Sequence, residues 1–441
     1  MFSFLQRDLP AVGRVLYRGG IPPSLDSLAA LRDGVTQRQT KAAEGQLWAV
    51  EATHPRWGTA GIVCERQPAP LPEVIVDVSL GLTDAEKASA KLGQSTIAVR
   101  VKSRQKQVLK DRKALLFWLR ALMEPDGAIA IDGTSTLLWS RAMLDDELAH
   151  DADLDVEALF AMHAVQDPDN PGRVRWLHTH GLEELGAFDM DVLEPSSMFV
   201  ANCSDPMRAA AFAALEGAIQ PDTASFPLAF PGGDVRFVPV DRFHAEAGEV
   251  HQRLRDPDEA HSGRRAVLCD PVGGILTRWL RSKPVPSRFA ASVSDGPIVT
   301  PFSTVATALM AERARKTLDV FRRLGEEFAE LNLPRIVKLA YDVDNATAGE
   351  REHLWFEVHR VLNGAVDATL ASEPFHVSAL KAGQRGEYDI ERMSDWTILS
   401  PEGQMSPRNY SAARRLRENY EMWKSRLRDS AGPASDQAPR G

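Results

Sequence analysis

Two histidines in one short segment are the sharpest candidates for chemistry in this chain. His178 and His180 lie in VRWLHTHGL, which predicts a strand, so both imidazoles should point to one face of it. Imidazole and carboxylate groups are ligands for divalent ions. Four acidic side chains follow closely in the sequence: Glu183, Glu184, Asp189 and Asp191. We therefore take His178 and His180 as candidate metal ligands, and His178, His180, Asp189 and Asp191 as the candidate functional surface.

A structural interpretation of the same histidines stays open. In it, one imidazole bonds backbone groups in a turn, the other faces solvent, and Gly181 supplies a positive φ. A metal site would need a third ligand, and His163 could supply one. The pattern LDVEALFAMHAV predicts a helix over 154–165, so this site requires that helix to pack against the strand. A divalent metal is the one cofactor that the sequence suggests, and no catalytic residue is assigned.

The three cysteines favour structural roles. Cys64, Cys203 and Cys269 are odd in number, far apart and without a Cys-x-x-Cys pair, which argues against a disulfide scaffold and a zinc ribbon. Cys203, at a predicted helix start, is the best placed of them for a nucleophile. The chain has no Gly-x-Ser-x-Gly, P-loop or Gly-x-Gly-x-x-Gly motif, so hydrolase and nucleotide-binding folds of those classes are not expected.

The composition of the chain indicates in which compartment the protein lies and which classes of partner are not expected. The chain has 441 residues and a formal net charge of -9, with a basic stretch between Arg100 and Lys113 that is interpreted as a strand end and a helix face. A nucleic-acid partner is therefore not expected. Without a signal-peptide core or an apolar run of about 18 residues, the sequence predicts a cytoplasmic protein with no membrane partner.

The pattern of elements predicts a multi-domain α+β protein. Helical and alternating segments occur through the front and the middle of the chain, and short strands dominate the end. Whether 46–330 forms one domain or two stays open. The expected parts are an accessory segment over 1–45, an α+β domain over 46–200, a second α+β unit over 201–330 ending in a long helix, a β-rich domain with a closing helix over 331–429, and a disordered tail over 430–441.

The C-terminal part predicts a small, strongly bent sheet or a partly open barrel. Asn363-Gly364 is a strong signal for a two-residue hairpin, because both residues tolerate a positive φ. Trp355 and Trp396 are expected as opposite walls of one core. Asp395 is expected to accept backbone N–H bonds where its strand begins.

Four motifs in this part carry a resemblance to a family: Leu354-Trp355-Phe356-Glu357-Val358, Ser372-Glu373-Pro374-Phe375, Leu380-Lys381-Ala382-Gly383-Gln384 and Ser394-Asp395-Trp396. In this order they resemble the bacterial YegJ-like domain of unknown function, over about 70 residues of the chain. Ser372 stands where that family usually has Asn, and Met393 where it has Ile. The resemblance implies structural roles for Trp355, Pro374, Gly383, Asp395 and Trp396.

A softer resemblance lies in the front part. Trp176-Leu177-His178-Thr179-His180-Gly181-Leu182 is similar to an uncharacterised bacterial domain that often precedes a YegJ-like tail. Some relatives of that domain are grouped with immunity proteins of toxin systems. The expected function is therefore a non-catalytic module that binds an unknown protein partner, in immunity or stress, with the oligomeric state open. The alternative is a metal-dependent hydrolase centred on His178 and His180.

Overall fold

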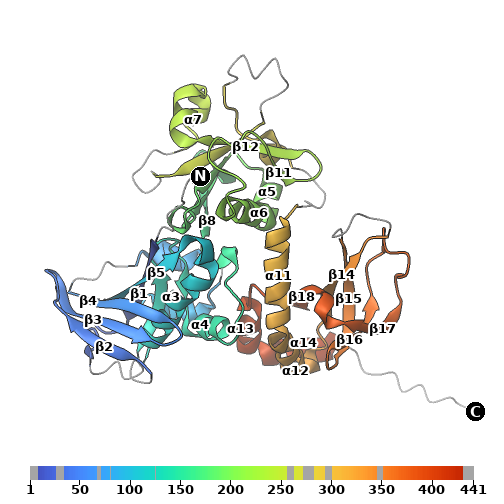
Figure 1. Ribbon diagram of the computed structural model, residues 1–441, viewed down its shortest axis with the longest axis horizontal. Helices are drawn as coiled ribbons and strands as arrows, with labels where there is room; N and C mark the ends of the chain where they lie inside the picture. Colours follow the sequence, from blue (N-terminus) through green and yellow to red (C-terminus); the bar gives the residue numbers. More distant parts are fainter. Residues whose placement is uncertain are drawn as a thin grey trace, which may run out of the picture. The chain divides into compact units, whose positions relative to one another are not determined.

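The protein is seen here as a computed structural model (Figure 1). Its chain divides into two compact units. Unit 1 comprises 1–79, 84–148 and 154–306, and unit 2 comprises 80–83, 149–153 and 307–441. The structure describes residues 8–25, 34–66, 71–79, 81–124, 126–255, 263–271, 283–293, 300–344 and 351–430. The predicted α+β class is confirmed, and the described residues form two sheets in unit 1 and one in unit 2.

Sheet A of unit 1 is a seven-stranded antiparallel sheet with the order β2-β3-β4-β5-β1-β6-β7. Helix α3 packs on it through Leu115, Trp118 and Leu119, all of which are buried. Its strands are β1 (Asp8–Tyr17), β2 (Thr36–Thr40), β3 (Gln46–His54), β4 (Gly58–Glu65), β5 (Ser95–Arg104), β6 (Gly127–Asp132) and β7 (Leu138–Trp139). The helices around it are α1 (Glu73–Asp77), α2 (Asp84–Ala90), α3 (Val108–Leu122) and α4 (Arg141–Leu148).

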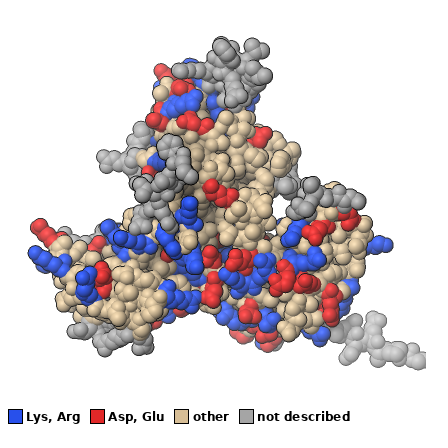
Figure 2. Space-filling view, in the orientation of Figure 1, with Lys and Arg blue, Asp and Glu red and all other residues tan. Residues whose placement is uncertain are grey.

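The basic stretch of the sequence divides between the surface and the core. Arg100 and Lys102 alternate on β5 with buried Val99 and Val101 and are exposed, as their spacing predicts. Arg112 and Lys113 of α3 have only 1% and 4% of their surface exposed. On the face seen in Figure 2, cationic and acidic side chains are interspersed.

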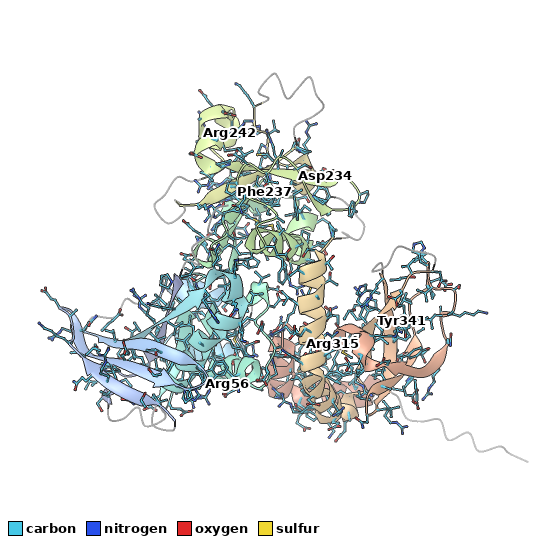
Figure 3. All side chains as sticks on the ribbon, viewed as in Figure 1. Arg56, Asp234, Phe237, Arg242, Arg315 and Tyr341 are labelled. Carbon is cyan, nitrogen blue, oxygen red and sulfur yellow. The ribbon has the colours of Figure 1, made fainter. Side chains whose placement is uncertain are left out.

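Sheet B of unit 1 is a six-stranded mixed sheet with the order β11-β12-β13-β10-β9-β8, in which β10 and β13 run parallel. One face of this sheet packs against Phe243 of α7. Phe237 of β12, which is labelled in Figure 3, contacts Phe188 with ring centroids 5.3 Å apart. The strands are β8 (Ala161–Asp167), β9 (Asn170–His180), β10 (Asp189–Leu193), β11 (Phe226–Ala229), β12 (Gly233–Pro239) and β13 (Arg265–Cys269). The helices are α5 (Ser197–Asn202), α6 (Ser204–Leu215), α7 (Val240–Glu246), α8 (Glu249–Gln252) and α10 (Arg288–Ser292).

Unit 2 contains an open six-stranded antiparallel sheet, with the order β17-β16-β15-β14-β18-β19, and it is not closed into a barrel. One face forms the core with α12 and α13. The strands are β14 (Arg335–Asp342), β15 (Arg351–Val361), β16 (Ala365–Leu370), β17 (Arg385–Asp389), β18 (Met393–Ser400) and β19 (Gly403–Met405). The helices are α11 (Thr304–Lys316), α12 (Leu318–Glu327), α13 (Ser411–Glu418) and α14 (Tyr420–Ser430).

The long helix predicted before this sheet is interrupted at Thr317. The Thr317 hydroxyl donates to the carbonyl oxygens of Arg313 (2.8 Å) and Ala314 (3.2 Å), and its oxygen accepts from Nε1 of Trp396 (2.9 Å). Back-bonding of this kind competes with the helical ladder. The result is two helices, α11 and α12, that meet at a residue buried against the sheet.

The two tryptophans of this sheet occupy opposite faces, so the prediction of two walls of one core is wrong. Trp396 is fully buried and pairs in register with Val337, whereas Trp355 pairs with Lys338, the next residue along β14. Successive residues of a strand face opposite sides. The ring of Trp355 therefore lies on the other face, 5.1 Å from the ammonium of Lys338.

The other predicted structural residues of unit 2 lie in turns and irregularities of the sheet. Asn363-Gly364 forms the β15–β16 hairpin, as predicted, with Gly364 at φ 78°. Gly383 has φ 77° and donates to Leu370. Asp395 accepts from the N–H of Trp396 (2.9 Å), next to a bulge in β18. Pro374 lines a small cleft with Asp344, Phe375, His376, Val377, Ser378 and Leu380.

Within the described part of the chain, no helix has the length and apolar character needed to cross a membrane.

Candidate metal centre

His163, His178 and His180 come together on β8 and β9, the last two strands of sheet B. His163 is the cross-strand partner of His178, and Ala161 is the partner of His180. Side chains two residues apart on a strand share a face, and those directly opposite on an antiparallel partner lie next to them. The pairing register alone therefore gathers the three imidazoles, with a methyl group opposite His180.

The imidazole rings form a compact triangle. Their centroids lie 5.6 Å apart for His163 and His178, 5.0 Å for His163 and His180, and 4.8 Å for His178 and His180. One ring nitrogen from each lies within 4.8 Å of the others, and among the described residues no carboxylate or thiol belongs to the group. His178 is 2% exposed, while His163 and His180 are half-buried, so solvent reaches the cluster from their side.

This spacing suits one tetrahedral ion after small side-chain rotations. Zinc bound at 2.0–2.1 Å holds its nitrogen ligands about 3.3–3.4 Å apart. The three nitrogens would therefore approach one another by at most about 1.5 Å, which modest changes in χ1 and χ2 supply. The packing of Trp176 on His178, with centroids 4.2 Å apart, fixes the position of the buried ligand.

His163 lies on a strand, so the prediction of a helix over 154–165 is wrong. The helical turn there is a short 3-10 segment, Val156–Ala158, capped by Asp155. The carboxylate of Asp155 also binds Nε of Arg208 at 2.8 Å, and both side chains are buried. This distant ion pair fixes the turn, and the chain then enters β8.

Gly181 ends the histidine strand with a φ of 110°, as the loop interpretation of the sequence expects. A Cβ there would lie 2.8 Å from the carbonyl oxygen of Leu159 and 2.9 Å from Cβ of Ser135. The turn after His180 therefore requires glycine both for its backbone conformation and for space.

Asp191 lies opposite His178 in the sheet but binds arginines. Its carboxylate accepts from Nε of Arg255 (2.8 Å) and Nη2 of Arg265 (2.7 Å), and all three side chains are at most 4% exposed. The Arg255 guanidinium also lies over Trp176, 5.3 Å from the ring centroid. Asp191 thus pairs with His178 in the sheet through its backbone and binds two arginines through its side chain.

Asp189 secures the turn that follows the histidine strand. Its Oδ1 accepts from the hydroxyl of Thr179 (2.8 Å) and the N–H of Leu182 (3.2 Å), and its Oδ2 lies 3.7 Å from Nη1 of Arg265. Burial raises the pKa of Asp189 to about 6, although the charge of Arg265 opposes that shift. Asp189 and Asp191 are therefore buried beside the cluster, and the structure does not bring them to it as ligands.

The raised pKa of Asp189 predicts a specific pH dependence. A free Asp titrates near 3.9, so between about pH 4 and 6 the folded chain holds a proton that the unfolded chain has lost. The contribution of Asp189 to the free energy of unfolding is thus largest below about pH 4, and it is lost as the pH rises through 6. We measure the free energy of unfolding by urea titration at pH 4.5 and at pH 7.5. At pH 7.5, Asp189→Asn should raise this free energy by about 2–3 kcal/mol relative to the wild type, and at pH 4.5 the difference should be smaller. A pH-independent difference would contradict this.

Arg255 and Arg265 were not identified from the sequence. The signal for them was indirect: FDMDVL is an apolar strand pattern that carries two carboxylates, and buried carboxylates need cationic partners. The sequence does not show which arginines supply them, because Arg255 is 64 residues away from Asp191.

The cysteines have the structural character that the sequence predicts. Cys64, Cys203 and Cys269 are buried and in the thiol form. Burial raises the pKa of Cys203 to about 11, so at neutral pH it holds its proton and is a poor nucleophile.

Comparison with known proteins shows that part of the chain is similar to a protein family. Residues 306–406 match the model of an uncharacterised protein family conserved in bacteria, DUF2314. This range runs from α11 to the end of the sheet of unit 2 and lies outside the histidine cluster. Neither curated proteins nor solved structures gave a match.

Proposed function

We propose that unit 1 binds one divalent transition-metal ion through His163, His178 and His180 and acts as a metal-dependent hydrolase. The observation that carries this proposal is the convergence of three imidazoles on two paired strands, with one nitrogen of each within 4.8 Å of the others. The resemblance to an immunity-associated domain, the YegJ-like name and a protein-binding role stay predictions, and the histidine geometry supports the metal site more strongly.

The ligand chemistry selects the ion. The described part of the chain offers three imidazole nitrogens and no thiolate or carboxylate to the ion, a set that suits zinc, copper, nickel or cobalt and does not suit magnesium or calcium. Zinc is the default, because it accepts tetrahedral coordination without redox chemistry.

Three protein ligands are the pattern of a catalytic zinc site, which keeps a fourth position for water. The half-exposed His163 and His180 leave that position accessible from solvent. A zinc ion held by His163, His178 and His180 would lower the pKa of a bound water and so would supply a nucleophile near neutral pH. This chemistry is hydrolysis of an ester, amide or phosphate bond.

Metal content and affinity test the site. We expect the purified protein, dialysed against zinc, to retain about one zinc ion per chain by elemental analysis. His163→Ala, His178→Ala and His180→Ala should each weaken zinc binding by more than about 100-fold in titration calorimetry, because loss of even an outer partner of a ligand costs about 10–100-fold.

His376→Ala is the matched control, because His376 is exposed and belongs to unit 2. It should bind zinc like the wild type. Hydrolysis of p-nitrophenyl acetate should require zinc and follow the same pattern across the variants. Wild type that retains no zinc, or histidine variants that bind as tightly as the control, would overturn the proposal.

A further inference from the structure

The charges around the histidine cluster bear on which substrates it takes. All three candidate ligands are neutral imidazoles when they bind a metal, so the ligands themselves cancel none of the charge of a divalent ion. No Asp or Glu oxygen of the described residues lies in the group of ligating atoms. The full charge of the ion must then be balanced by groups outside the ligand set or by what else binds to the ion.

The two described acids of the neighbouring strand β10, Asp189 and Asp191, both lie close to arginines. Asp191 is shared by Arg255 and Arg265, and Asp189 lies 3.7 Å from Arg265. Two carboxylates and two guanidiniums sum to no net charge. Among the described residues, these four therefore add no net negative charge beside the metal.

Burial strengthens the attraction of a bound ion for an anion. His178 is 2% exposed, and next to it lies an apolar cluster that includes Trp176, Leu193, Val238 and Val267. Electrostatic attraction grows as the local dielectric constant falls. An anion bound to the ion thus gains more here than it would at an exposed ion.

We propose that the substrate of this centre is a small oxyanion, such as a phosphate monoester, which would bind through an anionic oxygen beside the water on the metal as the coordination number rises from four to five. The inference rests on the proposed metal site and specifies its substrate class. Hydrolysis of such an ester breaks its P–O bond to the alcohol; the water oxygen stays on phosphorus, and the alcohol carries away a proton of that water. Inorganic phosphate, the product, should then be a ligand of the centre.

Ala161 offers a position at which a carboxylate and its uncharged amide counterpart can be compared beside the cluster. It is the cross-strand partner of His180, lies two residues before His163 on the same face of β8, and is 8% exposed. Ala161→Asp would place a carboxylate beside the cluster, and Ala161→Asn would place a group of the same shape without charge.

Cobalt spectroscopy separates this inference from the metal proposal. Cobalt(II) replaces zinc in such sites and gives visible absorption that depends on its ligands. In the cobalt-loaded wild type and Ala161→Asn, inorganic phosphate at constant ionic strength should change the spectrum with saturation, and it should inhibit zinc-dependent hydrolysis competitively. In Ala161→Asp, cobalt should still bind, and the apparent phosphate affinity should fall at least about tenfold.

The outcomes distinguish the two claims. If cobalt binds at one per chain but phosphate leaves the wild-type spectrum unchanged, the anion inference is wrong and the metal site stands. The same conclusion follows if both Ala161 variants respond to phosphate like the wild type. If cobalt does not bind to the wild type, the proposed function itself is overturned. Acetate in a parallel titration distinguishes a general carboxylate site from one that prefers phosphate.

Discussion

Asp191→Asn should lower the free energy of unfolding of unit 1 by about 3–5 kcal/mol, because it removes the charge that two buried arginines share. The Asn side chain keeps the volume of the carboxylate but cannot balance Arg255, whose Nε bonds Asp191 at 2.8 Å. In the variant, Arg265 still donates a hydrogen bond to the carbonyl oxygen of Thr179 at 2.9 Å. We therefore expect most of the lost free energy to come from Arg255. The measurement is the urea concentration at the unfolding midpoint of unit 1, with tryptophan fluorescence as the signal.

Asp145 provides the control for this variant. It pairs with Arg120 at 2.5 Å, but its side chain is 53% exposed, so Asp145→Ala should cost less than about 1 kcal/mol. If Asp191→Asn were as mild as the Asp145 variant, the two arginines would not depend on Asp191, and the account of the buried network would be wrong.

Trp396→Ala should destabilise unit 2 by about 3–5 kcal/mol, the usual cost of deleting a buried aromatic side chain. Trp396 is fully buried, contacts Phe321 with ring centroids 5.4 Å apart and donates from Nε1 to Thr317 at 2.9 Å. The variant therefore leaves a cavity and removes the bond at the junction of α11 and α12. Thermal unfolding by near-ultraviolet circular dichroism reports on this environment.

Trp355→Ala is a control of the same residue type in the same sheet. Trp355 is half-buried on the opposite face, where its ring contacts Lys338. Its removal opens no cavity in the helix-covered core, so the cost should be clearly smaller than that of Trp396→Ala. Equal losses in both variants would mean that the two faces of the sheet contribute alike, contrary to the observed packing.

Local patterns predicted the elements whose structure is decided locally. The two-residue spacing of His178 and His180 places both on one face of β9, and Asn363-Gly364 forms the hairpin that its chemistry requires. Alternation on β5 likewise separates exposed Arg100 from buried Val99. In each case the deciding interaction lies within a few residues of the pattern.

The failures come from contacts between distant residues. The segment before His163 has helical spacing, but the bond of Asp155 to Arg208 holds it as a short turn, and a strand follows. The helix after Thr304 stops at Thr317 because that hydroxyl bonds its own helix and meets Trp396, 79 residues away. Neither partner can be identified from local sequence.

The face of Trp355 was missed for a related reason. The alternation along β15 divides its residues into two sets, but which set faces the helices depends on the pairing register with β14. A shift of one residue exchanges the two faces of a strand. The third histidine shows the same dependence, since only the register of β8 on β9 places His163 opposite His178.

X-ray absorption fine structure of the zinc-loaded protein tests the central claim most directly, since it reports the ligands of the ion themselves. The account predicts three imidazole ligands at zinc–nitrogen distances of about 2.0–2.1 Å with one further oxygen or nitrogen, and no sulfur. His163→Ala should lose one imidazole from that shell. A sulfur shell, or a wild-type spectrum with fewer than two imidazoles, would show that the ion binds elsewhere and that the histidine cluster is not a metal centre.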